Sequence, residues 1–188
     1  MEYRLILASS SQTRKKFFDL CEVPFEVIPS NLDESKFASD DVFKLVETLA
    51  QEKAKVVAES LTNVQIIGVD TVISFENHIL GKPRNKMQAV EFLKKLSNQQ
   101  HSIVNGWAVL KKTNYVVKSS SGVAETNIRF RRLSKQDIEH YCNDYDVTQW
   151  AAGYNPFSRA IGFINSIEGS FGGLYGLPLE QILAQITD

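Results

Sequence analysis

One stretch constrains the fold of this chain more than any other. Residues 66–75 read IIGVDTVISF, a β-branched run that is typical of a buried strand, yet an acid lies in its middle. The carboxylate of Asp70 is costly to bury there unless it is paired, hydrogen-bonded or bound to a metal. Gly68 weakens a strand interior and indicates close backbone approach or a bend. The sequence therefore predicts a central strand, and the partners of Asp70 must come from other segments.

Strands and helices alternate in the first half of the chain, and a hairpin follows. Apolar residues recur at helical spacing over 41–60 and 86–96, and Ser134 with Asp137 predicts the capped start of another helix. This order predicts an α/β fold with a mixed sheet, and without repeats or linkers in the sequence we expect a single domain over 1–188. The expected strands cover 3–8, 25–29, 66–75, 101–110, 114–118 and 122–130.

Composition and charge narrow the kinds of partner. The 188 residues carry a formal net charge of -1, which gives no reason to expect general attraction to a nucleic-acid polymer or a membrane. A phosphate site would therefore have to be a local cluster. The apolar start is too short for a signal peptide or a membrane span. Cys21 and Cys142 follow no metal spacing, which favours free thiols, so we expect a cytoplasmic protein.

The turn after the first strand is a candidate anion-binding site. Ser9 and Ser11 belong to a hydroxyl-rich turn that leads into a helix, whose N-terminus offers unpaired N–H groups and a positive dipole. Arg14 adds fixed charge and can hold a phosphate through two parallel hydrogen bonds. Alternatively, a serine caps the helix, while Arg14 and the two lysines after it form a solvated face.

Further charged positions could complete such a site. Glu34 and its neighbour Asp33 lie in a polar loop and could reach a metal, although such acids are more often turn or N-cap residues. Lys53 falls close to the apolar face of its helix, where a lysine must snorkel to the surface or meet an anion. Lys82 follows a glycine just beyond the strand that carries Asp70. An acid and a lysine from neighbouring strand ends are the parts needed to hold a metal and a phosphate.

Aromatic residues gather in an irregular region over 147–165, among them Tyr154, Phe157 and Phe163. They could stack on a base or close a core, and the sequence leaves both interpretations open. Beyond this region, four glycines lie within residues 169–176, which indicates a backbone held close to another group. A short final helix is expected after them.

Four stretches together resemble the Maf family of nucleoside triphosphate pyrophosphatases. They are Leu7-Ala8-Ser9-Ser10-Ser11 with Arg14, Gln51-Glu52-Lys53-Ala54, Gly68-Val69-Asp70-Thr71 through Leu80-Gly81-Lys82-Pro83, and Gly169-Ser170-Phe171 with Gly176-Leu177-Pro178-Leu179. Each stretch is modest alone. Their order and spacing cover almost the whole chain, so the combination is specific.

The resemblance implies a fold and an activity. The fold would be an elongated mixed sheet with flanking helices and two lobes around a central cleft, usually in a homodimer. The activity would be hydrolysis of a nucleoside triphosphate to a monophosphate and pyrophosphate, with Mg²⁺ or Mn²⁺ as the cofactor. By position, the resemblance assigns Asp70 as the catalytic carboxylate, Glu34 and Asp70 as metal ligands, and Ser9, Arg14, Lys53 and Lys82 as triphosphate-binding residues.

Two positions depart from the family pattern. Thr13 stands where the family turn usually has its first arginine, and Phe157 stands where a glutamine usually reads the base. Thr71 matches the group acting on dTTP and UTP, whereas members acting on methylated guanine nucleotides have glutamine there. Because Phe157 can stack on a base but cannot read its edge, the resemblance implies a dTTP/UTP-type or modified substrate with relaxed or altered base choice.

Two alternatives stay open. The first is a 7-methyl-GTP pyrophosphatase, which a panel of substrates would separate from the dTTP/UTP type. The second is a non-catalytic nucleotide-binding regulator of cell division, which would bind nucleotides without releasing pyrophosphate. A protein that only binds nucleotides has no need of one set of residues together, so the sequence favours the enzyme. The set is Asp70, Lys53, Lys82 and Arg14.

Overall fold

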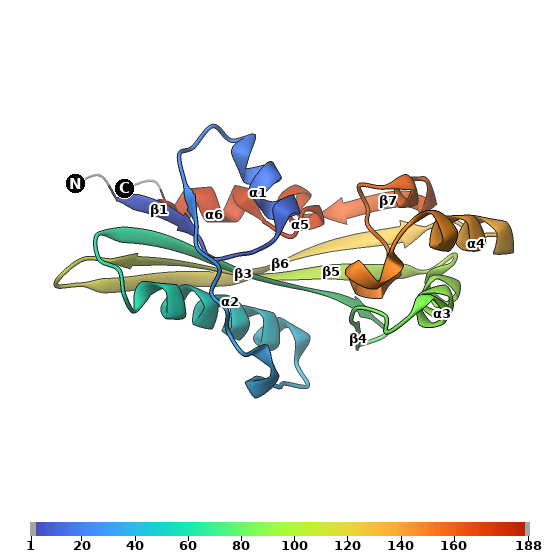
Figure 1. Cartoon of the computed structure of the whole chain (residues 1–188), viewed down its shortest axis with the longest axis horizontal. Helices are drawn as coiled ribbons and strands as arrows, with labels where there is room; N and C mark the ends of the chain where they lie inside the picture. Colours follow the sequence, from blue (N-terminus) through green and yellow to red (C-terminus); the bar gives the residue numbers. More distant parts are fainter. Residues whose placement is uncertain (1–2, 187–188) are drawn as a thin grey trace. The chain divides into compact units, whose positions relative to one another are not determined.

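A computed structural model describes residues 3–186 of the chain. Within these residues seven strands form one sheet in the order β2-β1-β3-β5-β6-β7, and β4 pairs with β3 outside this path (Figure 1). Strand β1 pairs in parallel with β2 and β3, while β3/β4 and β6/β7 are antiparallel pairs. The predicted α/β fold with a mixed sheet is therefore confirmed.

The elements have the following bounds. The strands are β1 (Arg4–Leu7), β2 (Glu26–Val27), β3 (Val64–Phe75), β4 (His78–Leu80), β5 (Gln100–Lys112), β6 (Val117–Phe130) and β7 (Ile164–Gly169). The α-helices are α1 (Gln12–Asp19), α2 (Val42–Ala58), α3 (Lys86–Leu96), α4 (Lys135–Asp144), α5 (Phe171–Leu174) and α6 (Leu179–Ile186). The 3-10 helices are η1 (Glu34–Lys36), η2 (Val147–Gln149), η3 (Ala151–Gly153) and η4 (Arg159–Phe163). No helix within residues 3–186 is long and apolar enough to cross a membrane.

The chain divides into two compact units. Of the described residues, unit 1 holds 3–71, 104–125 and 170–186, and unit 2 holds 72–103 and 126–169. Strands β3, β5 and β6 therefore contribute residues to both units. The single domain over 1–188 that the sequence suggests stays a prediction.

In unit 1, helices cover both faces of the sheet. Helix α2 packs on one face in a core that includes Ile66 of β3, and helices α1 and α6 pack on the other face in a core that includes Ile67. Successive side chains of a strand point to opposite faces, so Asp70 and Thr71 also point to different layers. The acid faces α2 and the hydroxyl faces α1.

Gly68 allows α2 to lie unusually close to β3. A Cβ atom at this position would lie 2.0 Å from the carbonyl oxygen of Ala50 and 2.9 Å from the backbone nitrogen of Ala54. Gly106 allows β5 to lie equally close to α2, nearer the N-terminus of the helix. A Cβ atom at Gly106 would lie 2.0 Å from the carbonyl oxygen of Val46. The close backbone approach predicted for Gly68 is confirmed, and it brings the Lys53 side chain of α2 onto the strand.

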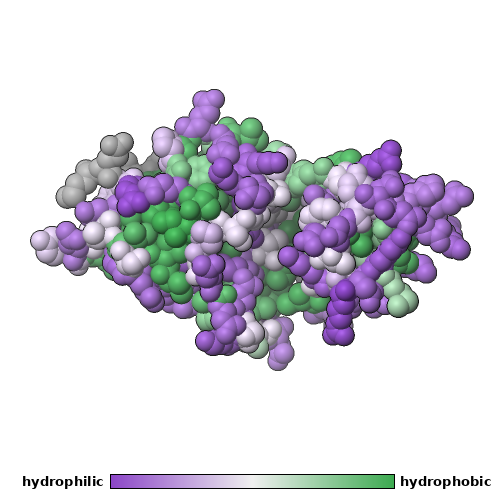
Figure 2. Space-filling view, viewed as in Figure 1, coloured by the Kyte–Doolittle hydropathy of each residue, from purple (hydrophilic) through white to green (hydrophobic). Residues whose placement is uncertain are grey.

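Unit 2 has an aromatic core of its own. Phe130 and Tyr154 are buried with ring centroids 5.0 Å apart, and Phe163 lies 5.9 Å from Phe130. Most of the irregular aromatic region therefore closes a core, while Phe157 remains 41% exposed. Helix α4 begins with the predicted capping box at Ser134. On the face shown in Figure 2, hydrophilic side chains gather over this helix.

The later strands differ from the prediction in two ways. Separate strands over 114–118 and 122–130 are not found, because β6 runs unbroken over Val117–Phe130. The serine-rich stretch between them has weak strand propensity, but the Ser121 hydroxyl bonds to two side chains of α2 at 2.7 and 2.8 Å and so favours the strand. Strand β7 was not expected, because its mostly exposed residues give no apolar alternation.

Candidate active site

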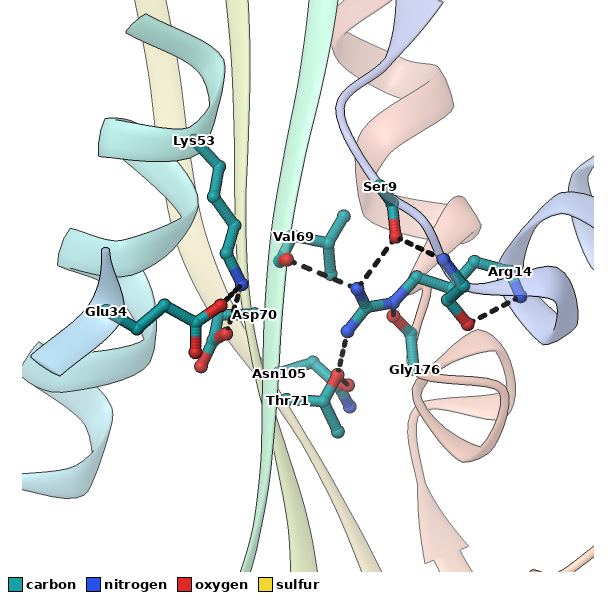
Figure 3. Close-up of polar contacts among 10 residues, drawn as sticks. Ser9, Arg14, Glu34, Lys53, Val69, Asp70, Thr71, Asn105 and Gly176 are labelled. Atoms are coloured by element: carbon teal, nitrogen blue, oxygen red, sulfur yellow. Dashed lines mark hydrogen bonds and ion pairs between the residues drawn. The ribbon is translucent and has the colours of Figure 1, made fainter. Parts of the chain in front are cut away.

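An ion cluster lies where β3 passes α2 in unit 1 (Figure 3). The Lys53 ammonium lies 2.6 Å from Oδ1 of Asp70 and 2.8 Å from Oε1 of Glu34. The side chains of Asp70 and Lys53 are 8% and 11% exposed, whereas that of Glu34 is 54% exposed. The buried acid thus has the partner that its burial requires, and the cluster reaches solvent at Glu34.

Local structure places each member of the cluster. Lys53 belongs to the buried face of α2, a helix whose N-cap Asp41 accepts two backbone N–H groups of the first turn. Glu34 opens the short helix η1, which Asp33 caps by accepting the Ser35 backbone N–H at 3.3 Å. Of the two neighbouring acids in this loop, Asp33 is therefore the N-cap residue and Glu34 is the one that reaches Lys53.

Arg14 organises the other face of β3. Its Nε donates to the carbonyl oxygen of Gly176 at 2.7 Å, and its Nη2 donates to Oγ1 of Thr71 at 2.7 Å. Its Nη1 donates to Oγ of Ser9 at 3.1 Å and to the carbonyl oxygen of Val69 at 3.3 Å. The guanidinium thus joins α1 to β3 and to the loop between α5 and α6.

The guanidinium of Arg14 is half-buried among its hydrogen-bond partners. Burial lowers the pKa of its guanidinium, while the negative charges of Asp70 and Glu34 act in the opposite direction. The predicted contact of Arg14 with a triphosphate stays a prediction, and such a contact would compete with four acceptors that the protein itself supplies.

The turn before α1 is arranged around the Ser9 hydroxyl. Oγ of Ser9 accepts from Arg14 and, at 3.2 Å, from the backbone N–H of Ser11. Ser11 is the N-cap of α1 and accepts the backbone N–H of Arg14 at 3.3 Å. The capping interpretation is thus confirmed for Ser11, while Thr13, at the atypical position of the turn, is exposed. Anion binding by Ser9 stays a prediction.

The sequence reasoning missed Asn105, a fully buried residue of β5. Its Oδ1 accepts the Thr71 hydroxyl at 2.6 Å, and its Nδ2 donates to the carbonyl oxygen of Gly173 at 3.0 Å. A signal was present in the sequence, because a single amide interrupts the apolar run IVNGWAVL over 103–110 much as Asp70 interrupts its own strand.

The predicted site residues fall into two groups. Lys82 is exposed just after β4, and Phe157 is exposed between η3 and η4, with its backbone N–H donating to Oδ1 of Asn155 at 2.9 Å. Both belong to unit 2, and their predicted roles in substrate binding stay predictions. The predicted residues that the structure brings together in unit 1 are Ser9, Arg14, Glu34, Lys53, Asp70 and Thr71.

The ion cluster has donors that fit a divalent cation. Asp70 and Glu34 direct carboxylate oxygens toward one point, where the Lys53 ammonium lies. Mg²⁺ is commonly bound through one or two carboxylates, with substrate phosphates and water as its other ligands. Within residues 3–186 no group of three or more His, Cys, Asp or Glu residues could hold a metal. The two acids could supply only part of a cation's ligands, and water or a phosphate would have to supply the others.

Comparisons with known sequences agree with the resemblance to the Maf family. The model of the family described as Maf-like protein matches residues 4–188. A dTTP/UTP pyrophosphatase of Bacillus mycoides is 31% identical, and one of Bacillus anthracis is 32% identical; each match covers 97% of this chain and 94% of the relative. Among solved structures, a HAM1 protein from Coxiella burnetii is 14% identical with a TM-score of 0.45 over 98% of both chains. The family model and the relatives cover nearly the full length, and this chain belongs to the Maf-like protein family.

Proposed function

We propose that this chain hydrolyses nucleoside triphosphates of the dTTP/UTP type to a nucleoside monophosphate and pyrophosphate. The observation that carries the proposal is the buried ion cluster, in which Asp70 is held 2.6 Å from Lys53 and Glu34 joins from the exposed side. Support comes from relatives named dTTP/UTP pyrophosphatase, which match 97% of the chain at 31% and 32% identity.

The residues of the cluster suit attack at phosphorus. A triphosphate brings concentrated negative charge, and the transition state spreads charge over the phosphoryl oxygens. An ammonium has three N–H donors, so Lys53 can donate to a phosphate oxygen while it remains bonded to a carboxylate. The Ser9 hydroxyl and the exposed Lys82 are further donors in this proposal. Asp70 orients the attacking water and takes its proton, because water is a poor nucleophile at neutral pH.

We also propose that Mg²⁺ or Mn²⁺ is required. When bound, a divalent cation neutralises phosphate charge and lowers the pKa of coordinated water. Asp70 and Glu34 would hold it, since their oxygens converge at 2.6 and 2.8 Å on the Lys53 ammonium. Lys53 would then release one or both carboxylates and turn its ammonium to the phosphate oxygens.

Pyrophosphate release from a panel of nucleoside triphosphates tests the proposal. The panel contains dTTP, UTP, CTP, GTP, ATP and 7-methyl-GTP, each with and without Mn²⁺ or Mg²⁺. We expect pyrophosphate and monophosphate from UTP and dTTP only when a divalent cation is present. Nucleotide binding without any pyrophosphate release would overturn the proposal and favour a regulator, and a preference for 7-methyl-GTP would overturn the substrate class.

The assembly and location belong to the same proposal. We expect a homodimer, which light scattering of the purified protein would detect. A cytoplasmic location fits a nucleotide substrate, and fractionation of cells that express the full chain would test it.

A further inference from the structure

The Asn105 amide fixes the direction of a hydrogen-bond chain in unit 1. Its Nδ2 lies 3.0 Å from the carbonyl oxygen of Gly173, and a carbonyl oxygen can only accept, so the amide nitrogen must face it. The amide oxygen therefore faces Thr71. Because an amide oxygen can also only accept, the Thr71 hydroxyl must give its proton to Asn105, at 2.6 Å.

Arg14 fixes the same hydroxyl from the other side. A guanidinium has donors and no acceptor, so Oγ1 of Thr71 must accept from Nη2 of Arg14, at 2.7 Å. A hydroxyl has one proton and two lone pairs, and in Thr71 the proton and one lone pair are now used. Thr71 is partly exposed, so what it offers a ligand is its second lone pair. It can accept a hydrogen bond but cannot donate one.

Ser9 shows the opposite pattern beside the same guanidinium. Both lone pairs of its hydroxyl are used, by Nη1 of Arg14 at 3.1 Å and by the backbone N–H of Ser11 at 3.2 Å. Within residues 3–186 no acceptor takes its proton, so Ser9 is left as a donor, the property that a phosphate oxygen requires. Of the two hydroxyls that accept from Arg14, that of Ser9 can donate to a ligand and that of Thr71 can only accept.

We infer that Asn105 is a positioning residue for base selection. If Thr71 faces the base of the nucleotide, as the proposed function requires, Asn105 makes Thr71 an acceptor by taking its proton. The partner would be the ring N3–H that uracil and thymine share. A phosphate oxygen has no proton to give, so it is a poor partner for this lone pair. Cytosine presents a lone pair of its own at N3, which would face that of Thr71. The inference rests on the proposed function and adds a selector within it.

The ratio of kcat/KM for UTP to kcat/KM for CTP, measured as pyrophosphate release, tests the inference. The wild-type protein should prefer UTP by about tenfold, the size of one well-placed hydrogen bond. Asn105→Leu has a similar size but no acceptor, so the Thr71 hydroxyl can turn its proton to CTP and the ratio should fall toward one. Asn105→Asp keeps an oxygen facing Thr71 but has no N–H for the carbonyl oxygen of Gly173, so a folded Asn105→Asp protein should preserve the ratio at a lower melting temperature.

A modified substrate and a double variant separate base selection from simple loss of structure. 3-methyl-UTP keeps both carbonyl groups of uracil without the N3–H, so the wild-type protein should treat it as poorly as CTP. Thr71→Val removes the hydroxyl itself, and Asn105→Leu should add no further loss of the ratio in a Thr71→Val background. Additive losses would overturn the inference, because they would show that Asn105 does not act through Thr71.

Ser121→Ala is the matched control. It removes a part-buried hydroxyl that joins β6 to α2 through bonds of 2.7 and 2.8 Å in the same unit, and it should leave the UTP to CTP ratio unchanged. Thermal unfolding of every variant shows whether it folds. If Asn105→Leu does not fold, Thr71→Ser and Thr71→Val decide, because the first keeps the hydroxyl and should keep the ratio, while equal losses in both would overturn the inference.

Different results would overturn the proposed function and the role of Asn105. Pyrophosphate release from no nucleotide at all would overturn the proposed function and this inference together. Release from UTP and CTP at equal efficiency would leave the proposed function in place and overturn the inference alone. An unchanged ratio in folded Asn105→Leu would do the same.

Discussion

Two buried polar clusters, one in each unit, differ in how they carry charge. In unit 1, Lys53 and Asp70 are buried as an ion pair and Glu34 joins them from the exposed side. In unit 2, Nε2 of His101 and the hydroxyl of Tyr154 are 2.6 Å apart inside an aromatic core. Burial lowers the pKa of His101 to about 4 and raises the pKa of Tyr154, so both groups are neutral at pH 7.

The difference separates a candidate site from a structural core. A neutral pair needs few partners, and within residues 3–186 Nδ1 of His101 has none. An ion cluster loses far more solvation when it is buried, and here the cluster is retained next to an exposed carboxylate, that of Glu34. A buried ion cluster with one exposed carboxylate therefore indicates a candidate active site, whereas a buried neutral pair indicates a part of the structural core.

The largest expected effect is that of Asp70→Asn. The amide has the shape of the carboxylate but cannot take a proton from water or hold a cation well, so pyrophosphate release from UTP should fall by roughly a thousandfold. The variant should still unfold in a single transition, because the amide keeps the shape of the carboxylate and Lys53 keeps Glu34 as a charged partner at 2.8 Å. Turnover close to wild type in this variant would remove Asp70 from the catalytic role.

Lys53→Met should have the next largest effect. It leaves Asp70 buried without its partner at 2.6 Å, which should lower the free energy of unfolding by about 4 kcal/mol. Adding Mn²⁺ without nucleotide should raise the melting temperature of this variant more than that of the wild-type protein, because a cation can replace the lost ammonium. Equal shifts in both proteins would argue against Asp70 and Glu34 as a cation site.

His101 predicts a pH dependence of stability in unit 2. Its pKa is about 4 in the folded protein against 6.5 ordinarily, so between these values the unfolded chain binds more protons and folding stability rises with pH. The contribution is complete above pH 6.5 and is lost progressively as the pH falls to 4, by about 3 kcal/mol in total. Urea unfolding at pH 7 and pH 4.5 should show a smaller drop for His101→Gln than for the wild-type protein. The same drop in both would contradict the assignment.

Arg14→Lys should have the smallest effect of the four. Lysine keeps the charge but cannot reach the four acceptors that the guanidinium bonds, so we expect the free energy of unfolding to fall by about 2 kcal/mol. Lys16→Gln, an exposed position on the same helix, is the control and should change it by less than about 0.5 kcal/mol. Equal stability of Arg14→Lys and the wild-type protein would show that Arg14 is not a structural cross-link.

Sequence reasoning succeeded where one residue conflicts with its surroundings. The position of Asp70 in an apolar strand predicted a buried partner for its carboxylate, and Gly68 predicted the close approach of a neighbouring backbone, which is that of α2. It failed where the information is spread along the chain. The bond from Arg14 to Thr71 joins residues 57 apart, and that from Asn105 to Gly173 joins residues 68 apart, so no local pattern could reveal either.

The strands show the same limit. The serine-rich middle of β6 looks like a turn until its hydrogen bonds to α2 are known, and β7 carries no apolar alternation because its side chains are largely exposed. Both are set by tertiary partners rather than by local propensity. The roles predicted for Lys82 and Phe157 come from the family resemblance, and their exposed positions in unit 2 do not test them.

Hydrolysis of UTP in ¹⁸O-labelled water with Mn²⁺ tests the central claim most directly. If the ion cluster directs water to the α-phosphorus, the wild-type protein will release UMP and pyrophosphate, with the label in UMP. Label in pyrophosphate would move the attack to the β-phosphorus. Release of UDP and inorganic phosphate, or no turnover, would contradict the account.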